Sequence, residues 1–138
     1  MNLPRSSSGK KLKKSQMTGC ESQHMKGVGI DIEEVTRFRT YDPRRQKTFY
    51  QKIFTDQEIR YCMSKKDPYP HFTARFCAKE AVTKALGRTL FSLKNIEITN
   101  DAKGYPSAHI REKNADYEVA VSLSHTKEYA VAIALWLH

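Results

Sequence analysis

The stretch from Arg75 to Gly87, RFCAKEAVTKALG, combines the pattern of a long helix with a cluster of charges. At about 100° per residue, Glu80 and Lys84 fall on the same face, one helical turn apart. Gly87 stands where a glycine commonly ends a helix, so we predict a helix from about His71 to Gly87. A stripe of small side chains, where another element could approach closely, consists of Ala74, Ala78, Ala81 and Ala85.

The charges of this helix allow two interpretations. Arg75, Lys79 and Lys84 surround the single carboxylate of Glu80. A metal-bridged phosphate site needs such a set, because Arg and Lys bind phosphate oxygens. An ordinary helix with one i, i+4 ion pair, worth about 0.2–0.5 kcal/mol, has the same residues. Small and apolar residues around most of the helix favour burial, and a buried glutamate needs partners or becomes protonated. These residues alone leave both interpretations open.

The composition indicates one soluble globular domain. The chain has 138 residues, of which 39% are hydrophobic and 28% are charged, which suits a single core. No apolar run approaches the roughly 20 residues of a membrane span, and the basic N-terminus lacks the apolar core of a secretory signal. Cys20, Cys62 and Cys77 lack metal-type spacing, so they favour a reducing cytoplasm over disulfides or zinc.

The net charge of +9 is divided between an N-terminal leader and the body of the protein. Residues 1–24 carry a net charge of +4, and residues 25–138 carry +5. The leader is rich in serine and lysine and has no periodic apolar face, so we predict that it is disordered and was added for expression; a native basic arm is the alternative. The mildly basic body suggests an anionic partner such as a phosphate ligand, an acidic protein or nucleic acid.

The order of the predicted elements indicates an α+β fold. A strand at 26–32 precedes a helix that begins between Asp31 and Glu34 and runs to about Tyr41, and further helices are expected at 44–54 and 55–65. The last of these begins with a Thr-x-x-Glu capping box at Thr55. Beyond the long helix, alternating residues predict strands at 95–99, 105–110, 118–124 and 129–137. One N-terminal strand, several helices and a final run of strands predict an antiparallel sheet packed against the long helix.

Two short segments could carry chemistry besides the helix. Asp31 ends the first predicted strand, and local sequence favours it as a helix N-cap, with Glu34 completing a capping box, over a metal ligand. The segment Ser122–Thr126 ends a strand with hydroxyls and an imidazole, which is also common turn chemistry. We take His125 as the functional histidine, because His71 and His109 have no partnered motif.

A basic surface with apolar anchors follows the first strand. It consists of Arg37, Arg39, Arg44, Arg45 and Lys47, interleaved with Phe38 and Tyr41. Nucleic acid or an acidic protein helix could bind such a surface. No nucleic-acid module, P-loop, dinucleotide fingerprint or nucleophile elbow accompanies it. A non-catalytic binding module therefore stays open as an alternative to an enzyme.

The motifs taken together, in their order, resemble the 4′-phosphopantetheinyl transferases, and the small single-domain holo-acyl-carrier-protein synthase type in particular. The resemblance covers essentially residues 25–137, which we take as the transferase domain within 25–138. Its motifs are Gly27-Val-Gly-Ile-Asp31-Ile32, Phe54-Thr55-x-x-Glu58, Arg75-Phe-x-Ala78-Lys79-Glu80-Ala81-x-x-Lys84-Ala85 and Ser122-x-Ser124-His125-Thr126.

The resemblance implies an enzyme that transfers phosphopantetheine from coenzyme A to a serine of an apo acyl carrier protein in fatty-acid biosynthesis. Asp31 and Glu80 would hold Mg²⁺, which suits two carboxylates completed by water and phosphate. Lys84 would reach a phosphate oxygen as a catalytic residue. The general base is left open by the sequence. Binding to the coenzyme would involve Arg75, Lys79, Lys84, His125 and Thr126.

The resemblance also implies partners. An acidic acyl carrier protein would dock on Arg37 and Arg45, while another basic position of the family is Thr48 here, which leaves carrier preference open. The family forms cytoplasmic homotrimers with active sites between subunits. We expect no membrane or nucleic-acid partner, and a polyketide or other carrier protein is the alternative client.

Overall fold

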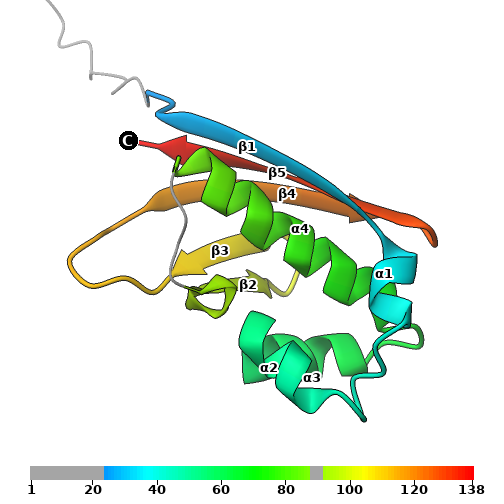
Figure 1. Ribbon diagram of the computed structural model, residues 1–138. Helices are drawn as coiled ribbons and strands as arrows, with labels where there is room; N and C mark the ends of the chain where they lie inside the picture. Colours follow the sequence, from blue (N-terminus) through cyan, green and yellow to red (C-terminus); the bar gives the residue numbers. More distant parts are fainter. Residues whose placement is uncertain (1–23, 88–91) are drawn as a thin grey trace, which may run out of the picture.

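The computed structural model describes residues 24–87 and 92–138 as an α+β fold (Figure 1). Strand β1 is followed by four helices, a short 3-10 helix and four strands. The elements are β1 (Gly27–Glu34), α1 (Val35–Arg39), α2 (Lys47–Ile53), α3 (Asp56–Met63), α4 (Tyr69–Ala85), η1 (Leu93–Asn95), β2 (Ile96–Asn100), β3 (Pro106–Ile110), β4 (Glu118–His125) and β5 (Tyr129–Leu137). The predicted fold class is confirmed.

The strands form two antiparallel sheets. The larger sheet has the order β1-β5-β4, so the first strand of the domain pairs with the last, and the smaller one is the β2–β3 hairpin. The long helix α4 lies across the larger sheet (Figure 1). In the register, Asp31 on the β1 edge lies opposite Ala132, and His125 on the β4 edge lies opposite Ala130. The two edges therefore carry different predicted site residues.

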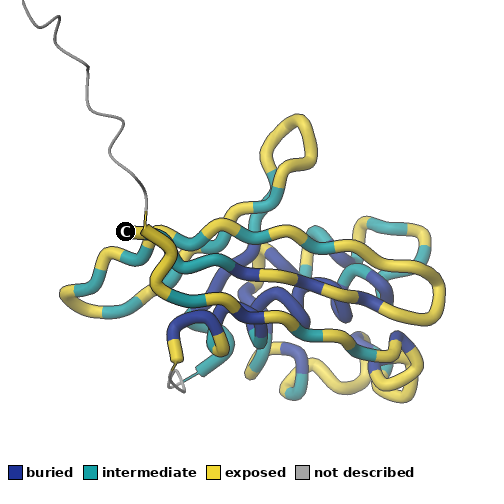
Figure 2. Tube along the Cα trace, turned by 90° about the horizontal axis from the view of Figure 1, so that it is seen from above, coloured by how far each residue is buried: buried dark blue, intermediate teal, exposed yellow. Residues whose placement is uncertain are grey.

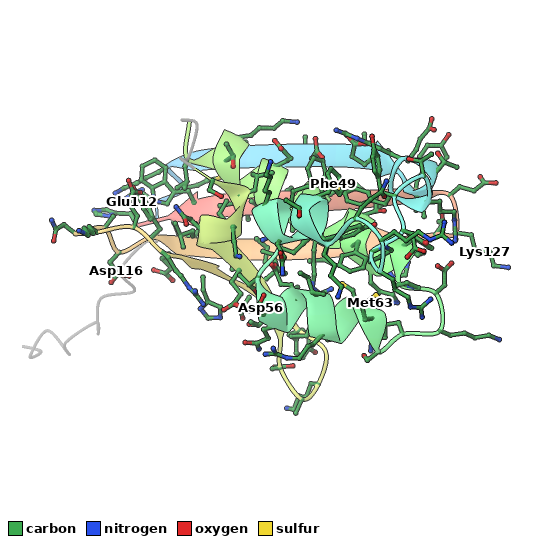
Figure 3. The ribbon with its side chains drawn as sticks, turned by 60° about the horizontal axis from the view of Figure 1, so that its bottom comes forward. Phe49, Asp56, Met63, Glu112, Asp116 and Lys127 are labelled. Atoms are coloured by element: carbon green, nitrogen blue, oxygen red, sulfur yellow. The ribbon has the colours of Figure 1, made fainter. Side chains whose placement is uncertain are left out.

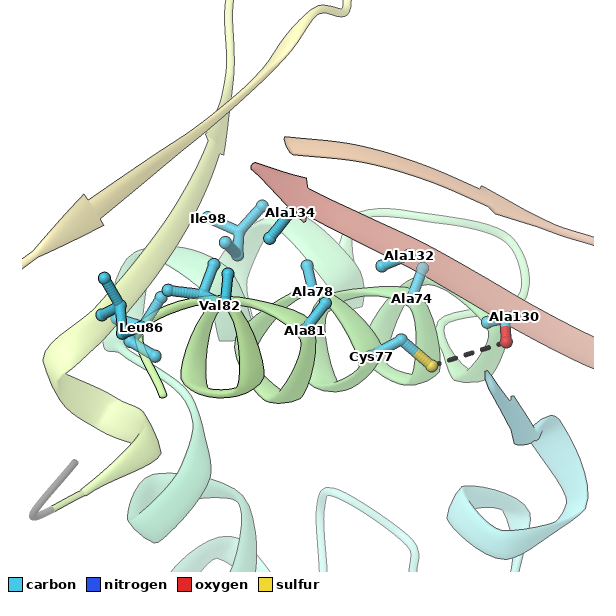
Figure 4. Close-up of a cluster of buried hydrophobic side chains, with 12 residues drawn as sticks. Ala74, Cys77, Ala78, Ala81, Val82, Leu86, Ile98, Ala130, Ala132 and Ala134 are labelled. Carbon is cyan, nitrogen blue, oxygen red and sulfur yellow. Dashed lines mark hydrogen bonds between the residues drawn. The ribbon is translucent and has the colours of Figure 1, made fainter. Parts of the chain in front are cut away.

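Glycines on β1 and alanines on α4 bring these two elements into close contact. A Cβ atom at Gly29 would overlap the carbonyl oxygen of Ala81, and one at Gly27 would overlap that of Ala85. The small-residue stripe of α4 also packs on the three buried alanines of β5, Ala130, Ala132 and Ala134 (Figure 4). The close approach of another element to this stripe, which the small residues predict, is confirmed, and it determines where the charges beside the stripe lie.

An aromatic cluster joins the small helices to the other side of α4. Phe38 of α1 lies 5.5 Å from Phe76 of α4, and Tyr50 of α2 lies 4.6 Å from Phe72, between ring centroids. Phe54 is fully buried between them, at 5.0 Å from Phe72. Aromatic pairs at these spacings add specific contacts to the burial of apolar area. This second core fixes α1, α2 and α3 relative to the long helix.

The helix boundaries agree with the sequence except after the first strand. The Thr55–Glu58 capping box forms as predicted, and Gly87 follows α4 with φ of +66°. The helix predicted to begin between Asp31 and Glu34 begins at Val35, with Glu34 as its N-cap, whereas the local preference for Asp31 as N-cap is wrong, because β1 continues to Glu34. Pairing with β5 extends through Glu34, and these main-chain bonds outweigh the local capping signal. Asp31 is therefore a strand residue, not an N-cap.

The outer face of the larger sheet is apolar and exposed. Burial alternates along β1 and β5, so one face of each strand packs on α4 and the other is open (Figure 2). The predicted strand 129–137 is thus buried on one face only. Five aliphatic side chains on the open face are between 37% and 65% exposed: Val28, Ile30, Ile32, Val131 and Ile133. Such a contiguous apolar patch is typical of an interaction surface.

The predicted leader at 1–24 lies outside the described residues, apart from His24. Among residues 24–87 and 92–138, no helix has the length and apolar character needed to cross a membrane.

Candidate functional site

The close packing of α4 on β1 brings together two carboxylates that are distant in the sequence. Asp31 points from the face of β1 that α4 covers, and Glu80 lies on α4 beside the alanine stripe. Burial raises the pKa of Glu80, and the negative charge of Asp31 raises it further. The second cause shows that the two carboxylates lie within electrostatic reach of each other. Their pairing around one ion, which the resemblance implies, stays a prediction.

Lys84 binds Asp31 instead of serving only as a helical counter-ion of Glu80. Its Nζ donates to Asp31 Oδ1 at 3.0 Å and to the carbonyl oxygen of Ile30 at 2.9 Å. The hydrogen bond to Asp31 is the main reason that the pKa of Lys84 is raised. The Lys84 side chain is nevertheless 53% exposed, so its ammonium faces solvent as well as the carboxylate. It can therefore meet a ligand without leaving Asp31.

The second oxygen of Asp31 is suited to a cation. Among the described residues, Asp31 Oδ2 is buried without a hydrogen-bond partner. A buried carboxylate oxygen without a partner is costly, and a bound cation would satisfy it. Two carboxylates are a donor set that Mg²⁺ accepts, since it takes its other ligands from water and phosphate. No group of three or more His, Cys, Asp or Glu that could hold a metal occurs in 24–87 or 92–138. The residues present fit Mg²⁺.

Glu33 is a third carboxylate near this site that sequence reasoning missed. It lies two residues beyond Asp31 on the same face of β1, and its charge contributes to the raised pKa of Glu80. Glu33 accepts from Arg37 at 2.7 Å, and the Arg37 guanidinium lies 5.1 Å from the Phe76 ring centroid. The period-two spacing of Asp31 and Glu33 could have revealed it once the strand was known to continue.

Arg75 lies on the opposite flank of α4. Its guanidinium stacks 3.8 Å from the ring centroid of Tyr61 and donates to Asn100 Oδ1 at 2.7 Å. The residue is 2% exposed, and its Nε has no partner among the residues that the structure describes. A buried guanidinium with a free donor is suited to a phosphate or carboxylate ligand. The predicted phosphate contact of Arg75 remains a prediction.

His125 and Thr126 lie where β4 ends, beside the first turn of α4. The Thr126 hydroxyl accepts from the backbone N–H groups of Glu128 and Tyr129 and thereby shapes the β4–β5 turn. The exposed His125 ring lies 4.8 Å from that of His71, between centroids. Sequence reasoning set His71 aside, because only the fold brings the start of α4 to the end of β4.

Lys79 requires a correction. The resemblance suggested a contact with coenzyme phosphates, but the side chain is fully buried and forms an ion pair with Glu58 at 2.7 Å. Its Nζ also donates to three main-chain carbonyl oxygens, those of Ile53, Leu93 and Ile96. Burial lowers the pKa of Lys79, whereas the negative charge of Glu58 acts in the opposite direction. Lys79 therefore links α4 to α3, η1 and β2 and is not presented to a ligand.

The predicted carrier-docking residues lie in the helical region around α1 and α2. Arg37 is 57% exposed in its pair with Glu33, and Arg45 is 87% exposed with only a distant pair to Asp42 at 3.9 Å. Arg39 is used internally, since it binds Asp67 and lies over Tyr69. Figure 3 views this region from below and labels Phe49 on α2 and the two ends of α3, Asp56 and Met63. The docking roles stay predictions.

The model of the 4′-phosphopantetheinyl transferase superfamily matches residues 27–134, which include both flanks of α4. The chain belongs to this superfamily.

Curated relatives in the superfamily are named as holo-[acyl-carrier-protein] synthases. One from Thermodesulfovibrio yellowstonii is 41% identical over 112 residues, covering 80% of this chain and 97% of the relative. One from Chlamydia trachomatis is 42% identical over 118 residues, covering 80% and 98%. This superfamily member therefore spans nearly the whole length of these relatives.

Solved structures of superfamily members share the fold. A holo-(acyl-carrier-protein) synthase of Bacillus anthracis in complex with CoA (3′,5′-ADP) superposes with a TM-score of 0.70 at 31% identity, covering 82% of this chain and 96% of that one. The Helicobacter pylori enzyme in complex with coenzyme A gives 0.70 at 25% identity, covering 79% and 98%. The transferase resemblance drawn from the motifs is thus confirmed at the level of family and fold.

Proposed function

We propose that this protein transfers the 4′-phosphopantetheine group of coenzyme A to a serine of an apo acyl carrier protein. The serine hydroxyl loses its proton to a general base, its oxygen forms a bond to phosphorus while the phosphoanhydride bond breaks, and adenosine 3′,5′-bisphosphate leaves. The observation that carries the proposal is the coupled pair of Asp31 and Glu80 with Lys84 bound beside it, in a chain 41% identical to a named holo-[acyl-carrier-protein] synthase. The proposal includes fatty-acid biosynthesis as the pathway and the cytoplasm as the location.

Asp31 and Glu80 would hold Mg²⁺, which when bound would neutralise the pyrophosphate and orient it for in-line attack. The partner-free Asp31 Oδ2 supports this assignment. Lys84 would keep its bonds to Asp31 and Ile30 and place its third N–H donor on a phosphate oxygen. Burial and the nearby charge of Asp31 raise the pKa of Glu80, so this carboxyl takes up a proton more readily than an exposed glutamate does.

Arg75 and His125 would bind another part of the coenzyme. The free Nε of Arg75 supports a phosphate contact, and the exposed His125 ring lies in the same cluster. Within one chain this cluster is separated from Asp31 and Glu80, because five residues rotate a helix by about 140° from Arg75 to Glu80. The strand register gives a second indication of this separation. Glu33 on β1 and His125 on β4 both pair with Ala130 of β5, from opposite sides, so their backbones lie two strand spacings, about 10 Å, apart.

This separation supports a site shared between subunits of a homotrimer. Each chain offers the Asp31 cluster on its β1 edge and the His125 cluster on its β4 edge. Head-to-tail association around a closed ring would place the β4 edge of one subunit beside the β1 edge of the next. The exposed aliphatic face of the sheet, centred on Ile30 at 61% exposure, provides apolar area for such an interface.

The first experiment tests the reaction. Purified protein, coenzyme A, Mg²⁺ and an apo carrier protein should yield a carrier heavier by one phosphopantetheine group in mass spectrometry. Asp31→Ala and Glu80→Ala should each abolish the addition, with circular dichroism spectra like that of the parent protein. A parent protein that modifies no carrier would refute the function, and full activity in both variants would refute the metal assignment.

A second experiment tests the shared site by complementation. Asp31→Ala and His125→Ala should each have reduced transfer activity alone. Mixed trimers refolded from the two variants should recover activity, because some of their interfaces combine an intact Asp31 edge with an intact His125 edge. Light scattering should give a trimer for the parent and a smaller species for Ile30→Glu. A mixture no more active than its components would show that each chain carries a complete site.

The carrier would dock on the exposed guanidinium groups of Arg37 and Arg45. Charge reversal at Arg45 should raise KM for the carrier and leave KM for coenzyme A unchanged. Competition between a fatty-acid carrier and a polyketide carrier would measure the client preference directly, and preference for the second would redirect the pathway without changing the chemistry.

A further inference from the structure

His71 and His125 form a histidine pair in ring contact. Their ring centroids are 4.8 Å apart, and the ring planes are inclined by 72°, so the edge of one ring meets the face of the other. His71 comes from the first turns of α4 and His125 from the end of β4, which Figure 1 shows at the same end of the molecule. The contact joins an element of the helical layer to an edge of the sheet.

The surroundings of His71 are aromatic and cationic. The Tyr61 ring lies 6.1 Å from His71, and the charges of Lys65 and Arg75 lie over Tyr61 at 4.4 and 3.8 Å. Burial lowers the pKa of His71, and the nearby His125, Lys65 and Arg75 lower it further. Asp67 is the opposing carboxylate, but Arg39 already binds it. The lowered pKa of His71 favours the neutral imidazole, which can stand beside cationic groups without repelling them.

His125 needs such a neighbour because it is otherwise loosely held. The side chain is exposed, and no described residue forms a hydrogen bond with its ring. The edge-to-face contact with His71 therefore limits its rotation. Edge-to-face pairs add specific stabilisation beyond the burial of area, and pre-orienting a ligand-binding side chain reduces the entropy lost on binding.

We propose that His71 is a positioning residue of the coenzyme site, whose ring holds the His125 imidazole toward the Arg75 cluster and a phosphate group of the bound coenzyme. This proposal rests on the proposed transferase function. In this proposal, His71 contacts no reacting atom of the coenzyme or of the carrier. The imidazole pair, the Tyr61 ring and the Arg75 guanidinium form one continuous wall from β4 to α3.

The test compares His71→Ala, which removes the ring, with His71→Phe, which keeps an aromatic edge. His71→Ala should raise KM for coenzyme A about two- to tenfold, the value of one edge-to-face contact, while kcat at saturating coenzyme and KM for the carrier stay unchanged. His71→Phe should remain within about twofold of the parent, by the same contact energy. His109→Ala is the matched control, since that imidazole binds Thr99 on the β2–β3 hairpin and should have no effect on KM.

Two results would overturn the proposal. An unchanged KM in His71→Ala would show that His125 needs no support, and equal damage in His71→Phe would show that the ring contact is not what matters. Calorimetric titration with adenosine 3′,5′-bisphosphate, without any carrier, gives the same comparison for binding alone. If the parent protein binds the nucleotide but modifies no carrier, the transferase function fails separately from His71. Should His71→Ala not fold, His71→Leu replaces it, because leucine also removes the ring.

Discussion

Two lysines of α4, five residues apart, illustrate different uses of an ion pair. Lys79 and Glu58 are both fully buried, and the Lys79 ammonium and both carboxylate oxygens of Glu58 have hydrogen-bond partners. Lys84 is 53% exposed in its pair with Asp31, whose second oxygen has no partner in the described part of the chain. The complete network stabilises the fold, whereas the incomplete one leaves an oxygen for a ligand. Residue type and spacing in the sequence do not distinguish the two lysines, because they differ in burial and in hydrogen-bond partners, which depend on the fold.

The largest effect is expected from breaking the buried pair. Lys79→Ala leaves the Glu58 carboxylate charged and buried without its partner, which should lower the free energy of unfolding by about 3–5 kcal/mol. Urea denaturation followed by circular dichroism measures the loss.

The double variant Lys79→Met with Glu58→Gln is the control, since it removes both charges but keeps an acceptor for the Thr55 cap. It should recover much of the lost stability. A single Lys79 variant as stable as the parent would erase the distinction between the two lysines.

The second prediction concerns the other lysine. Lys84→Ala should lower kcat at least about a hundredfold, as expected for removing one cation that meets charge developing in the transition state. Its denaturation midpoint should change little, because the pair is half exposed and screened by solvent. Mass spectrometry of the carrier and a urea titration on the same preparation measure both quantities. An inactive variant that is also strongly destabilised would place Lys84 in the same structural class as Lys79.

Sequence reasoning identifies the elements of this contrast but not the environments. The α4 boundaries, the Thr55 capping box and the alanine stripe follow from local patterns, and the structure agrees with each of them. Local sequence favours Asp31 as a helix cap, because the β1–β5 pairing that keeps it in a strand involves residues 100 positions away. The sequence does not reveal the structural role of Lys79, because its acceptors come from α2, α3, η1 and β2, which no local pattern brings together. The approach of His71 to His125 escapes sequence reasoning for the same reason.

The third prediction uses the glycine contact to disturb one lysine and not the other. Gly29→Ala introduces a Cβ that overlaps the Ala81 carbonyl oxygen, so β1 must move away from α4, with an expected cost of about 1–3 kcal/mol in unfolding free energy. Asp31 lies two residues along the same strand and should move with it, while Lys79 on the opposite flank stays in place. Transfer activity should therefore fall at temperatures where the variant is fully folded.

Gly104→Ala is the control for this substitution. Gly104 has a φ of +89°, and no neighbouring atom lies within 4 Å of the place that an alanine Cβ would take, so alanine there strains the backbone without moving β1. It should lower stability and leave the specific activity unchanged. Equal specific activity in Gly29→Ala would mean that Asp31 and Lys84 tolerate a shift of the strand.

The smallest effect should come from the carboxylate between the two lysines. The folded-state pKa of Glu80 is raised, so the folded protein binds this proton more readily than the unfolded chain does. The resulting stabilisation is full below the ordinary carboxyl pKa and is lost as pH rises through the raised value. In metal-free protein near neutral pH, the charged Glu80 therefore destabilises the fold.

Glu80→Gln should then raise the melting temperature slightly at pH 7.5 while abolishing transfer. The melting temperatures of parent and variant should converge as the pH falls and Glu80 becomes protonated. Asp31→Asn should not show the same gain, because it also weakens the bond from Lys84. A melting temperature of Glu80→Gln below that of the parent at pH 7.5 would contradict this prediction. The charged Glu80 would then stabilise the fold, as the Lys79–Glu58 pair does, and the two sides of α4 would no longer differ in this respect.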